Sequence, residues 1–204
     1  EYWATLPEDS RPKLYLYGLS QGSYGVESVL NSINVINEPI SGAFMSGPPF
    51  VNDLHTEIVT SRDPGTPEWR PTYASGRTAR FASEEGFADT PGPWGPTRVV
   101  YLQHGSDPVV FFSPSLAWSV PDWLQEGHRP PDVSPRMGWF PLVTMWQVAL
   151  DLPGAGNVPW GFGHMYSTRA NLDGWLAVTD PAGWTPEKTD ELAAVLDSRT
   201  TSSD

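Results

Sequence analysis

The chain has 204 residues, the length of one globular domain with a substantial core. Twelve basic residues against 24 acidic ones give a formal net charge of −12, which argues against nucleic acid as a partner because neutralising phosphates requires a basic surface. The sequence contains no cysteine, so disulfides, cysteine nucleophiles and cysteine zinc sites are excluded.

The N-terminal quarter predicts a strand, a helix and a second strand. Residues 13–18, KLYLYG, have the composition of a short buried strand that a glycine ends. Residues 23–34, SYGVESVLNSIN, place apolar side chains three and four positions apart, as one face of a helix does. The next strand is expected at 42–47, GAFMSG, because two prolines follow it directly.

In the following segment, residues 48–97, most of the turn signals lie in two stretches, SRDPGTPEWRPTYASGRTARF and DTPGPWGPTR. Its apolar pieces are short, and the only helix that we expect in it spans about 51–60. A long irregular segment within a compact domain is usually functional or disordered. We therefore interpret residues 48–97 as a lid or insertion over the functional site.

Regular structure is expected again in the second half of the chain. The sequence predicts a strand at 98–103, a proline-rich loop at 120–137 and an apolar helix at 138–152. A short extended run at 158–166 breaks into a glycine turn, and a final helix is expected at 186–197. Strands that alternate with helices indicate an α/β fold with a mostly parallel sheet flanked by helices.

The pentapeptide GLSQG, residues 18–22, lies between the first predicted strand and the first predicted helix. A Gly-x-Ser-x-Gly motif in this context is typical of the nucleophile elbow of α/β-hydrolases, where the serine stands on a sharp turn. Ser20 is then the candidate nucleophile, and the backbone N–H of Gln21 is the candidate donor to an oxyanion. The alternative is a glycine-rich turn in which Ser20 only caps the helix.

A serine nucleophile needs a base, and the chain offers four histidines. His164, in GFGHMY, lies on a glycine loop after a short extended run and is the best candidate. His55 lies in the proposed lid, and His128 is expected on an exposed loop. His104 ends a strand, where it is either a polar group behind the site or a core histidine. No two histidines have a metal-binding spacing such as HExxH, so we expect neither a metal nor a cofactor.

The base needs an orienting acid, for which Asp107 in HGSDPVV is the candidate, since it follows the strand at 98–103. Taken alone, Asp107 would be interpreted as a turn aspartate before proline. The order Ser20, Asp107, His164 along the chain is, however, the order of the α/β-hydrolase triad. Five aromatic residues near the motif loops are candidates for an apolar substrate site, although each is also a candidate for the core: Phe50, Phe111, Phe112, Trp118 and Trp123.

Several longer blocks resemble one family: RPKLYLYGLSQGSYGVE, RDPGTPEWRP, WGPTRVVYLQHGSDPVVFFSP, PDVSPRMGWFPLVTMWQVALDL and GFGHMY. From about residue 11 to residue 185, the sequence is similar to the C-terminal catalytic domain of an actinobacterial α/β-hydrolase family of integral membrane proteins. The resemblance implies a membrane-anchored cell-envelope protein whose hydrolase domain follows N-terminal transmembrane helices. The side of the membrane stays open.

The same resemblance implies that Ser20, Asp107 and His164 occupy the triad positions. Relatives often have Glu before the serine and Leu after it, where this chain has Leu19 and Gln21. The difference leaves the mechanism intact and changes the mouth of the site. This sequence itself contains no run of about 18 apolar residues and predicts no transmembrane helix.

An α/β-hydrolase sheet normally has several strands before the nucleophile strand, but only twelve residues precede the strand at 13–18. We therefore expect residues 1–204 to form a single, partial hydrolase domain that lacks the N-terminal strands. An N-terminal segment of the same protein would supply the neighbouring strand and the second oxyanion donor. It could stay bound as a separate chain, or a second copy could cover the strand edge.

The expected function is that of a serine hydrolase acting on carboxylic esters, esterase- or lipase-like, with a small-molecule or lipid ester as substrate. Acyl transfer to an alcohol or a sugar of cell-envelope lipids uses the same residues, and the sequence does not separate it from hydrolysis. The alternative is a catalytically silent, membrane-tethered binding or scaffold domain that has kept the hydrolase architecture.

Overall fold

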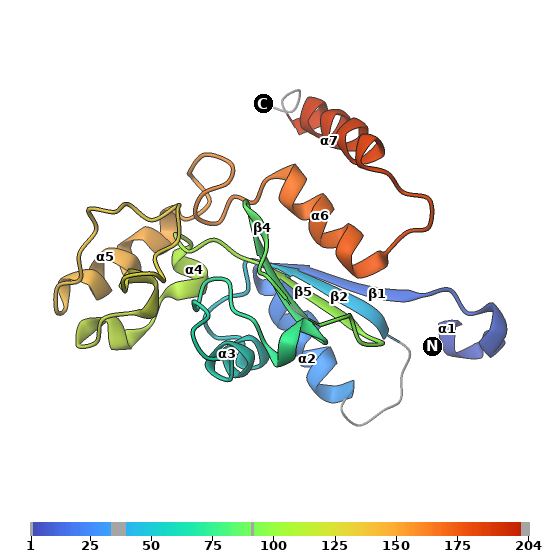
Figure 1. Cartoon of the computed structure of the whole chain (residues 1–204), viewed down its shortest axis with the longest axis horizontal. Coiled ribbons are helices and arrows are strands. Elements are labelled where there is room, and N and C mark those ends of the chain that lie inside the picture. The colour runs from blue at the N-terminus through green and yellow to red at the C-terminus, as the bar shows by residue number, and fades with distance from the viewer. Residues whose placement is uncertain (1, 34–39, 91, 201–204) are drawn as a thin grey trace.

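A five-stranded sheet forms the centre of the molecule, with helices on both of its faces (Figure 1). The computed structural model describes residues 2–33, 40–90 and 92–200. The strands are β1 (Leu14–Leu19), β2 (Ile40–Ser46), β3 (Ala79–Ser83), β4 (Gly86–Phe87) and β5 (Arg98–Leu102). Their order across the sheet is β1-β2-β5-β3-β4, and every neighbouring pair is parallel except β3 and β4. The predicted α/β class with a mostly parallel sheet is confirmed.

Helices cover both faces of the sheet, and others lie beyond its ends (Figure 1). They are α1 (Tyr2–Thr5), α2 (Gln21–Ile33), α3 (Asp53–Thr60), α4 (Pro108–Phe111), α5 (Val143–Asp151), α6 (Thr168–Thr179) and α7 (Pro186–Thr200). On one face, α2 and α3 bury Val26, Ile58 and Val59 against the strands. On the other face, α6 covers the sheet and α7 lies outside α6 (Figure 1). Both faces of the central strands β2 and β5 are therefore buried, as parallel sheets require.

Most predicted elements form, with ends shifted by a few residues. The strands expected at 13–18, 42–47 and 98–103 correspond to β1, β2 and β5, and the helices expected at 51–60 and 186–197 correspond to α3 and α7. The helix expected at 23–34 is α2, which begins two residues earlier, directly after Ser20; residue 34 lies outside the described residues.

The apolar helix expected at 138–152 is shorter than predicted. It corresponds to α5, which begins only at Val143. Leu142 has a left-handed backbone with φ of 61°, and the proline before it also disfavours a continuous helix. The hydroxyl oxygen of Thr144 accepts the N–H of Phe140 over 2.8 Å, so a turn replaces the first helical turn. The run at 158–166 likewise forms turns with one isolated bridge, Phe162 to Met165, rather than an extended segment.

Residues 48–97 are more regular than their composition suggested. Besides α3, they contain β3 and β4, which belong to the main sheet; β3 lies between β5 and β4 with most of its residues buried. The prolines and glycines therefore mark turns between regular pieces. This segment is thus partly built into the body of the domain, and a lid role for its loops stays a prediction.

Helix α6 was not predicted, because its sequence mixes polar and apolar residues and contains Gly174. That glycine lies against the sheet: a Cβ built on it would be 2.5 Å from the ring of Phe44. The glycine that weakens the helical pattern thus allows α6 to approach β2 closely.

The turn that joins β1 to α2 is held by close backbone packing. Ser20 has a left-handed backbone with φ of 54°, which is uncommon for a residue with a side chain. A Cβ on Gly18 would lie 2.3 Å from the carbonyl carbon and oxygen of Gly22 and 2.4 Å from the nitrogen of Ser23. Gly18 is thus the residue that the sharp turn requires, whereas a Cβ on Gly22 would meet nothing within 4 Å.

We predict that Gly18→Ala destabilises the protein by about 3 kcal/mol or more, because the new methyl group would overlap backbone atoms that cannot rotate away. For a domain of this size the loss corresponds to a fall in Tm of about 6 °C or more. The matched control, Gly22→Ala, should keep or slightly raise Tm, since alanine favours the helix by up to about 1 kcal/mol. Calorimetry of both variants checks the prediction, and equal Tm values would contradict it.

Candidate active site

The backbone of Ser20 is fixed by hydrogen bonds on both sides. Its N–H donates to the carbonyl oxygen of Ser46 at the end of β2 over 2.9 Å. Its own carbonyl oxygen accepts the N–H of Ser23 over 2.9 Å and the hydroxyl of Ser23 over 2.6 Å. The Ser20 side chain therefore stands at the N-terminus of α2, where the helix dipole favours negative charge.

The carboxyl group of Asp107 is completely buried and accepts three hydrogen bonds. Asp107 caps the N-terminus of α4, directly beyond β5, and its Oδ1 accepts the N–H of Val109 over 2.8 Å. Its Oδ2 accepts from His164 Nδ1 over 2.6 Å and from the hydroxyl of Tyr166 over 2.5 Å. Burial and the neighbouring Asp107 carboxylate raise the pKa of Tyr166 well above its usual value, so that hydroxyl stays protonated and donates.

The imidazole of His164 lies between Asp107 and the end of β2. Because Nδ1 donates to a carboxylate, the lone pair of the neutral ring is on Nε2. That Nε2 is buried and has no hydrogen-bond partner among the described residues. A Cβ on Gly47 would lie 2.5 Å from His164 Cε1, so the ring rests directly on Gly47. Gly47 follows Ser46, whose carbonyl holds Ser20, and the structure thus brings the three candidate residues to one edge of the sheet.

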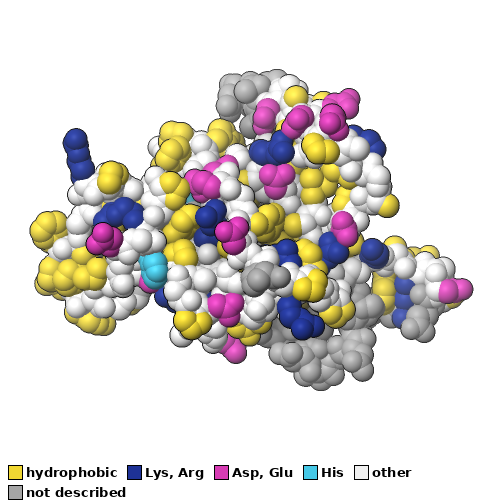
Figure 2. Space-filling model, in the orientation of Figure 1, with side chains coloured by type: hydrophobic (Ala, Val, Ile, Leu, Met, Phe, Trp, Pro, Cys, Tyr) yellow, Lys and Arg dark blue, Asp and Glu magenta, His cyan; other side chains and the backbone are white. Residues whose placement is uncertain are grey.

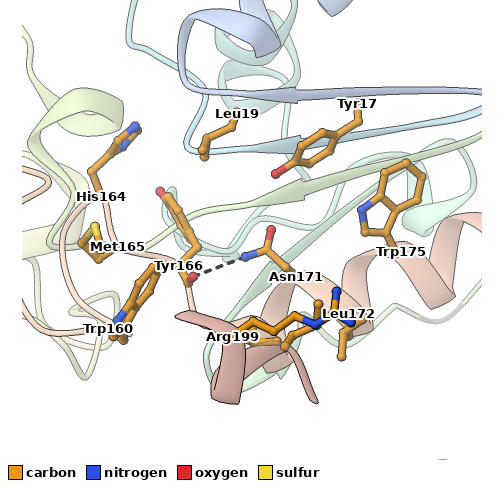
Figure 3. A pocket seen from close by; sticks show the side chains of 12 residues that line it. Tyr17, Leu19, Trp160, His164, Met165, Tyr166, Asn171, Leu172, Trp175 and Arg199 are labelled. Atoms are coloured by element: carbon orange, nitrogen blue, oxygen red, sulfur yellow. Dashed lines mark hydrogen bonds between the residues drawn. The ribbon is translucent and has the colours of Figure 1, made fainter. Parts of the chain in front are cut away.

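A pocket of about 780 Å³ opens beside His164. In Figure 3, Trp160, Met165 and Tyr166 lie near the histidine, and Tyr17 and Leu19 project from β1 across the opening. The remaining lining residues come from α6 and α7: Thr168, Asn171, Leu172, Trp175, Leu196 and Arg199. Most of the lining is apolar or aromatic, which suits a ligand with an apolar part.

The comparisons with known proteins identify the family of this fold. A family model described as "Alpha/beta-hydrolase family" matches residues 1–192. The chain belongs to the alpha/beta-hydrolase family. The same comparisons find no curated protein and no solved structure that matches the chain. Families with this fold are generally hydrolytic, so membership supports hydrolase activity without naming a substrate.

The other three histidines of this hydrolase-family chain have partners of their own. On α3, burial lowers the pKa of His55 to about 4, and its Nε2 lies 2.7 Å from Gln103 Oε1. His128 Nδ1 lies 2.7 Å from a carboxylate oxygen of Asp122. His104 is buried and contacts both Glu84 and the carbonyl of Gly163. None of these three rings is bound to Asp107.

The structure does not gather the five aromatic candidates around His164. Phe50, Phe111 and Phe112 line a separate pocket of about 140 Å³. Phe111 and Trp123 are mostly buried and line another of about 190 Å³, behind Asp107. The Trp118 side chain is 71% exposed. None of the five lines the pocket beside His164, and their role in substrate binding stays a prediction.

Sequence reasoning missed Gly47, Tyr166 and the aromatic residues from β1 and α6. The order of motifs along the chain locates the triad candidates. It does not predict which distant residues touch in the folded protein, such as Gly47 and His164. For metals, among residues 2–33, 40–90 and 92–200, no group of three His, Asp or Glu residues lies close enough to hold an ion.

We predict that Gly47→Ala displaces the His164 ring, because the new methyl group would overlap Cε1 and the ring of Tyr166. The measurement is proton NMR of the His164 Nδ1–H, which a short hydrogen bond to carboxylate shifts strongly downfield. That resonance should move or disappear in the variant.

The matched control for this prediction is Gly65→Ala. Gly65 also has a positive φ, of 81°, so alanine there carries a comparable backbone strain, but its Cβ would meet nothing within 4 Å. The control should keep the Nδ1–H resonance. An unchanged resonance in Gly47→Ala would show that His164 does not rest on Gly47.

Proposed function

We propose that the protein is a serine hydrolase of carboxylic esters that uses Ser20, His164 and Asp107. The observation that carries this proposal is the His164 ring: Nδ1 is bound to a buried carboxylate, and Nε2 is buried without a partner among the described residues. Ser20, with its positive φ, lies at the same edge of the sheet. A neutral imidazole held in this tautomer is what a general base beside a nucleophile requires.

The proposed chemistry follows from the positions of these groups. The Ser20 hydroxyl attacks the ester carbonyl while His164 Nε2 takes its proton, and Asp107 stabilises the imidazolium that forms. The negative charge on the carbonyl oxygen is stabilised by the N–H of Gln21, the first residue of α2, and by the helix dipole. His164 returns the proton to the departing alkoxide, leaving an acyl group on Ser20. Water then releases the acid; an alcohol in its place would give acyl transfer by the same route.

Residues 47–50, which directly follow β2, offer no second oxyanion donor. The N–H of Gly47 donates to Leu102, and that of Phe50 donates to Val109. The two residues between them are prolines, which have no N–H. Among the described residues, no strand pairs with the outer edge of β1. We infer that an N-terminal segment of the same protein pairs with that edge and supplies the second donor, as in other folds of this type.

We further propose that the substrate is a lipid ester presented at a membrane surface. Six large apolar side chains on or near α5 are each more than half exposed: Trp118, Phe140, Leu142, Val143, Trp146 and Leu150. Figure 2 shows hydrophobic side chains gathered over the end of the molecule that carries α5. Exposed apolar surface of this kind supports contact with a lipid interface. Trp160, which is also exposed, lines the pocket beside His164.

No helix in the described part of the chain is long and apolar enough to cross a membrane. Anchoring to the cell envelope by transmembrane helices elsewhere in the protein is a proposal that rests on the resemblance of the sequence. The net charge of −12 favours uncharged or zwitterionic lipid over anionic lipid as the surface that α5 touches.

We predict that a fluorophosphonate probe adds once to the protein, on Ser20, and that intact-protein mass spectrometry shows the single adduct. Ser20→Ala should take no adduct and should lower kcat for ester hydrolysis by about 10⁴-fold or more. An adduct on another residue would overturn the assignment. No adduct in protein that contains the N-terminal segment would favour the silent binding domain.

We predict that the double variant Trp146→Ser with Leu150→Ser weakens binding to phosphatidylcholine vesicles about 10-fold or more, since burying one large apolar side chain contributes about 1.5–3 kcal/mol. Val195→Ser is the matched control, because Val195 is an exposed apolar residue on α7. Co-sedimentation at low and high salt checks the prediction. Equal binding by the double variant and the control would contradict a role for α5.

A further inference from the structure

His104 is a buried histidine whose two ring nitrogens both face acceptors. The residue is 2% exposed, at the end of β5. Its Nδ1 lies 2.8 Å from the carbonyl oxygen of Gly163, and its Nε2 lies 2.9 Å from Glu84 Oε1. A carbonyl oxygen and a carboxylate oxygen only accept, so both ring nitrogens must donate. The geometry therefore requires the imidazolium form of His104.

Glu84, in the turn between β3 and β4, is the counter-ion. Its carboxylate accepts the N–H of Ser167 over 3.0 Å and the hydroxyl of Ser167 over 2.5 Å, in addition to His104. The hydroxyl oxygen of Ser167 in turn accepts the N–H of Ala170, and this hydrogen bond caps α6. The Ser167 hydroxyl hydrogen is then directed to Glu84. A carboxyl group with three donors around it is held as the anion.

This ion pair holds both ends of the segment that carries His164. His104 binds Gly163, the residue before His164, and Glu84 binds Ser167, three residues after it. Between them, the ring of Tyr166 stacks on His104 at 4.3 Å, with 27° between the planes. The same tyrosine donates its hydroxyl to Asp107. The ion pair thus lies directly behind the Asp107–His164 hydrogen bond.

We propose that His104, as an imidazolium paired with Glu84, is a positioning residue for His164, and that the enzyme works only while His104 is charged and His164 is neutral. This inference rests on the proposed function. A neutral His104 can donate to only one of its two acceptors. The other acceptor would then face a lone pair, and the segment from Gly163 to Ser167 would lose one of its two fixed ends.

The charges around His104 fit this arrangement. Burial lowers the pKa of its ring, but the hydrogen bonds that the ring donates to Glu84 and to the carbonyl of Gly163, together with the negative charges of Glu84 and Asp132, raise it above its usual value. Burial raises the pKa of Glu84, but its bonds to His104 and Ser167 outweigh burial and lower it. The third group that faces the ring, Tyr166, stays neutral because its pKa is raised well above its usual value.

A histidine whose pKa is raised in the folded protein contributes stability at pH values below its unfolded pKa, about 6.5, and loses it as pH rises through the folded value. The alkaline limb of the kcat profile should therefore report the loss of the proton from His104.

The test is the pH profile of ester hydrolysis by Glu84→Gln, in the protein with its N-terminal segment. Removing the counter-ion should shift the alkaline limb of kcat to lower pH by about one unit or more, with the acid limb and KM little changed. The matched control is Glu85→Gln, a neighbouring acid in the same turn that is bonded to Ser83 and not to His104. Its profile should match that of the unmodified protein. An unshifted alkaline limb in Glu84→Gln would overturn the inference.

A second measurement separates this inference from the proposed function. Nitrogen NMR of histidine-labelled protein reads the protonation of His104 without any turnover; both ring nitrogens should carry protons at pH 7, and only one in Glu84→Gln. A singly protonated His104 at pH 7 in the unmodified protein would overturn the inference even if the enzyme is active. A protein that takes no phosphonate on Ser20 and hydrolyses no ester would overturn the proposed function, and with it the role of His104 in turnover.

Discussion

The buried carboxylate of Asp107 is the contact on which the candidate site depends. It has no exposure to solvent, and three donors from two separate parts of the chain satisfy it: Val109, His164 and Tyr166. A buried carboxylate left without donors is strongly destabilising, so the loop after β5 and the segment before α6 must lie together for the domain to fold. The free energy that fixes the fold at this point therefore also fixes the tautomer and direction of the His164 ring.

The parallel sheet explains why these groups meet where they do. In the register of β1, β2 and β5, Leu19 pairs with Ser46, and Ser46 pairs with Leu102, so the three strands end side by side. The residues just beyond those ends share one edge of the sheet. Parallel strands place their carboxyl-terminal loops together in this way, and ligands of open α/β sheets bind in the crevice outside them. Two residues make this general arrangement specific here. Gly18 permits the sharp turn after β1, and Asp107, which caps α4 after β5, binds His164.

The sequence predicted those parts of the molecule that depend on local pattern. The elbow, the strands β1, β2 and β5, and the order of Ser20, Asp107 and His164 follow from short motifs and hydrophobic periodicity. Contacts between distant segments have no such signal, and the pairing of Glu84 with His104 and Ser167 emerged only from the fold. Composition predicted a mostly irregular segment at 48–97. The turn residues there instead separate the short regular elements α3, β3 and β4. The apolar run at 138–152 predicted that a helix forms there. It predicted neither that α5 begins at Val143 nor which of its apolar side chains are exposed.

In the proposed mechanism, Ser20, His164 and the N-terminus of α2 act on one reacting centre. The most direct test is a crystal structure of the protein after reaction with a phosphonate. We predict a bond between phosphorus and Ser20 Oγ, a phosphoryl oxygen that accepts the N–H of Gln21, and His164 Nε2 within hydrogen-bond distance of an oxygen on phosphorus. A phosphoryl oxygen directed away from α2, or a His164 ring that leaves Asp107 to reach the adduct, would contradict the account.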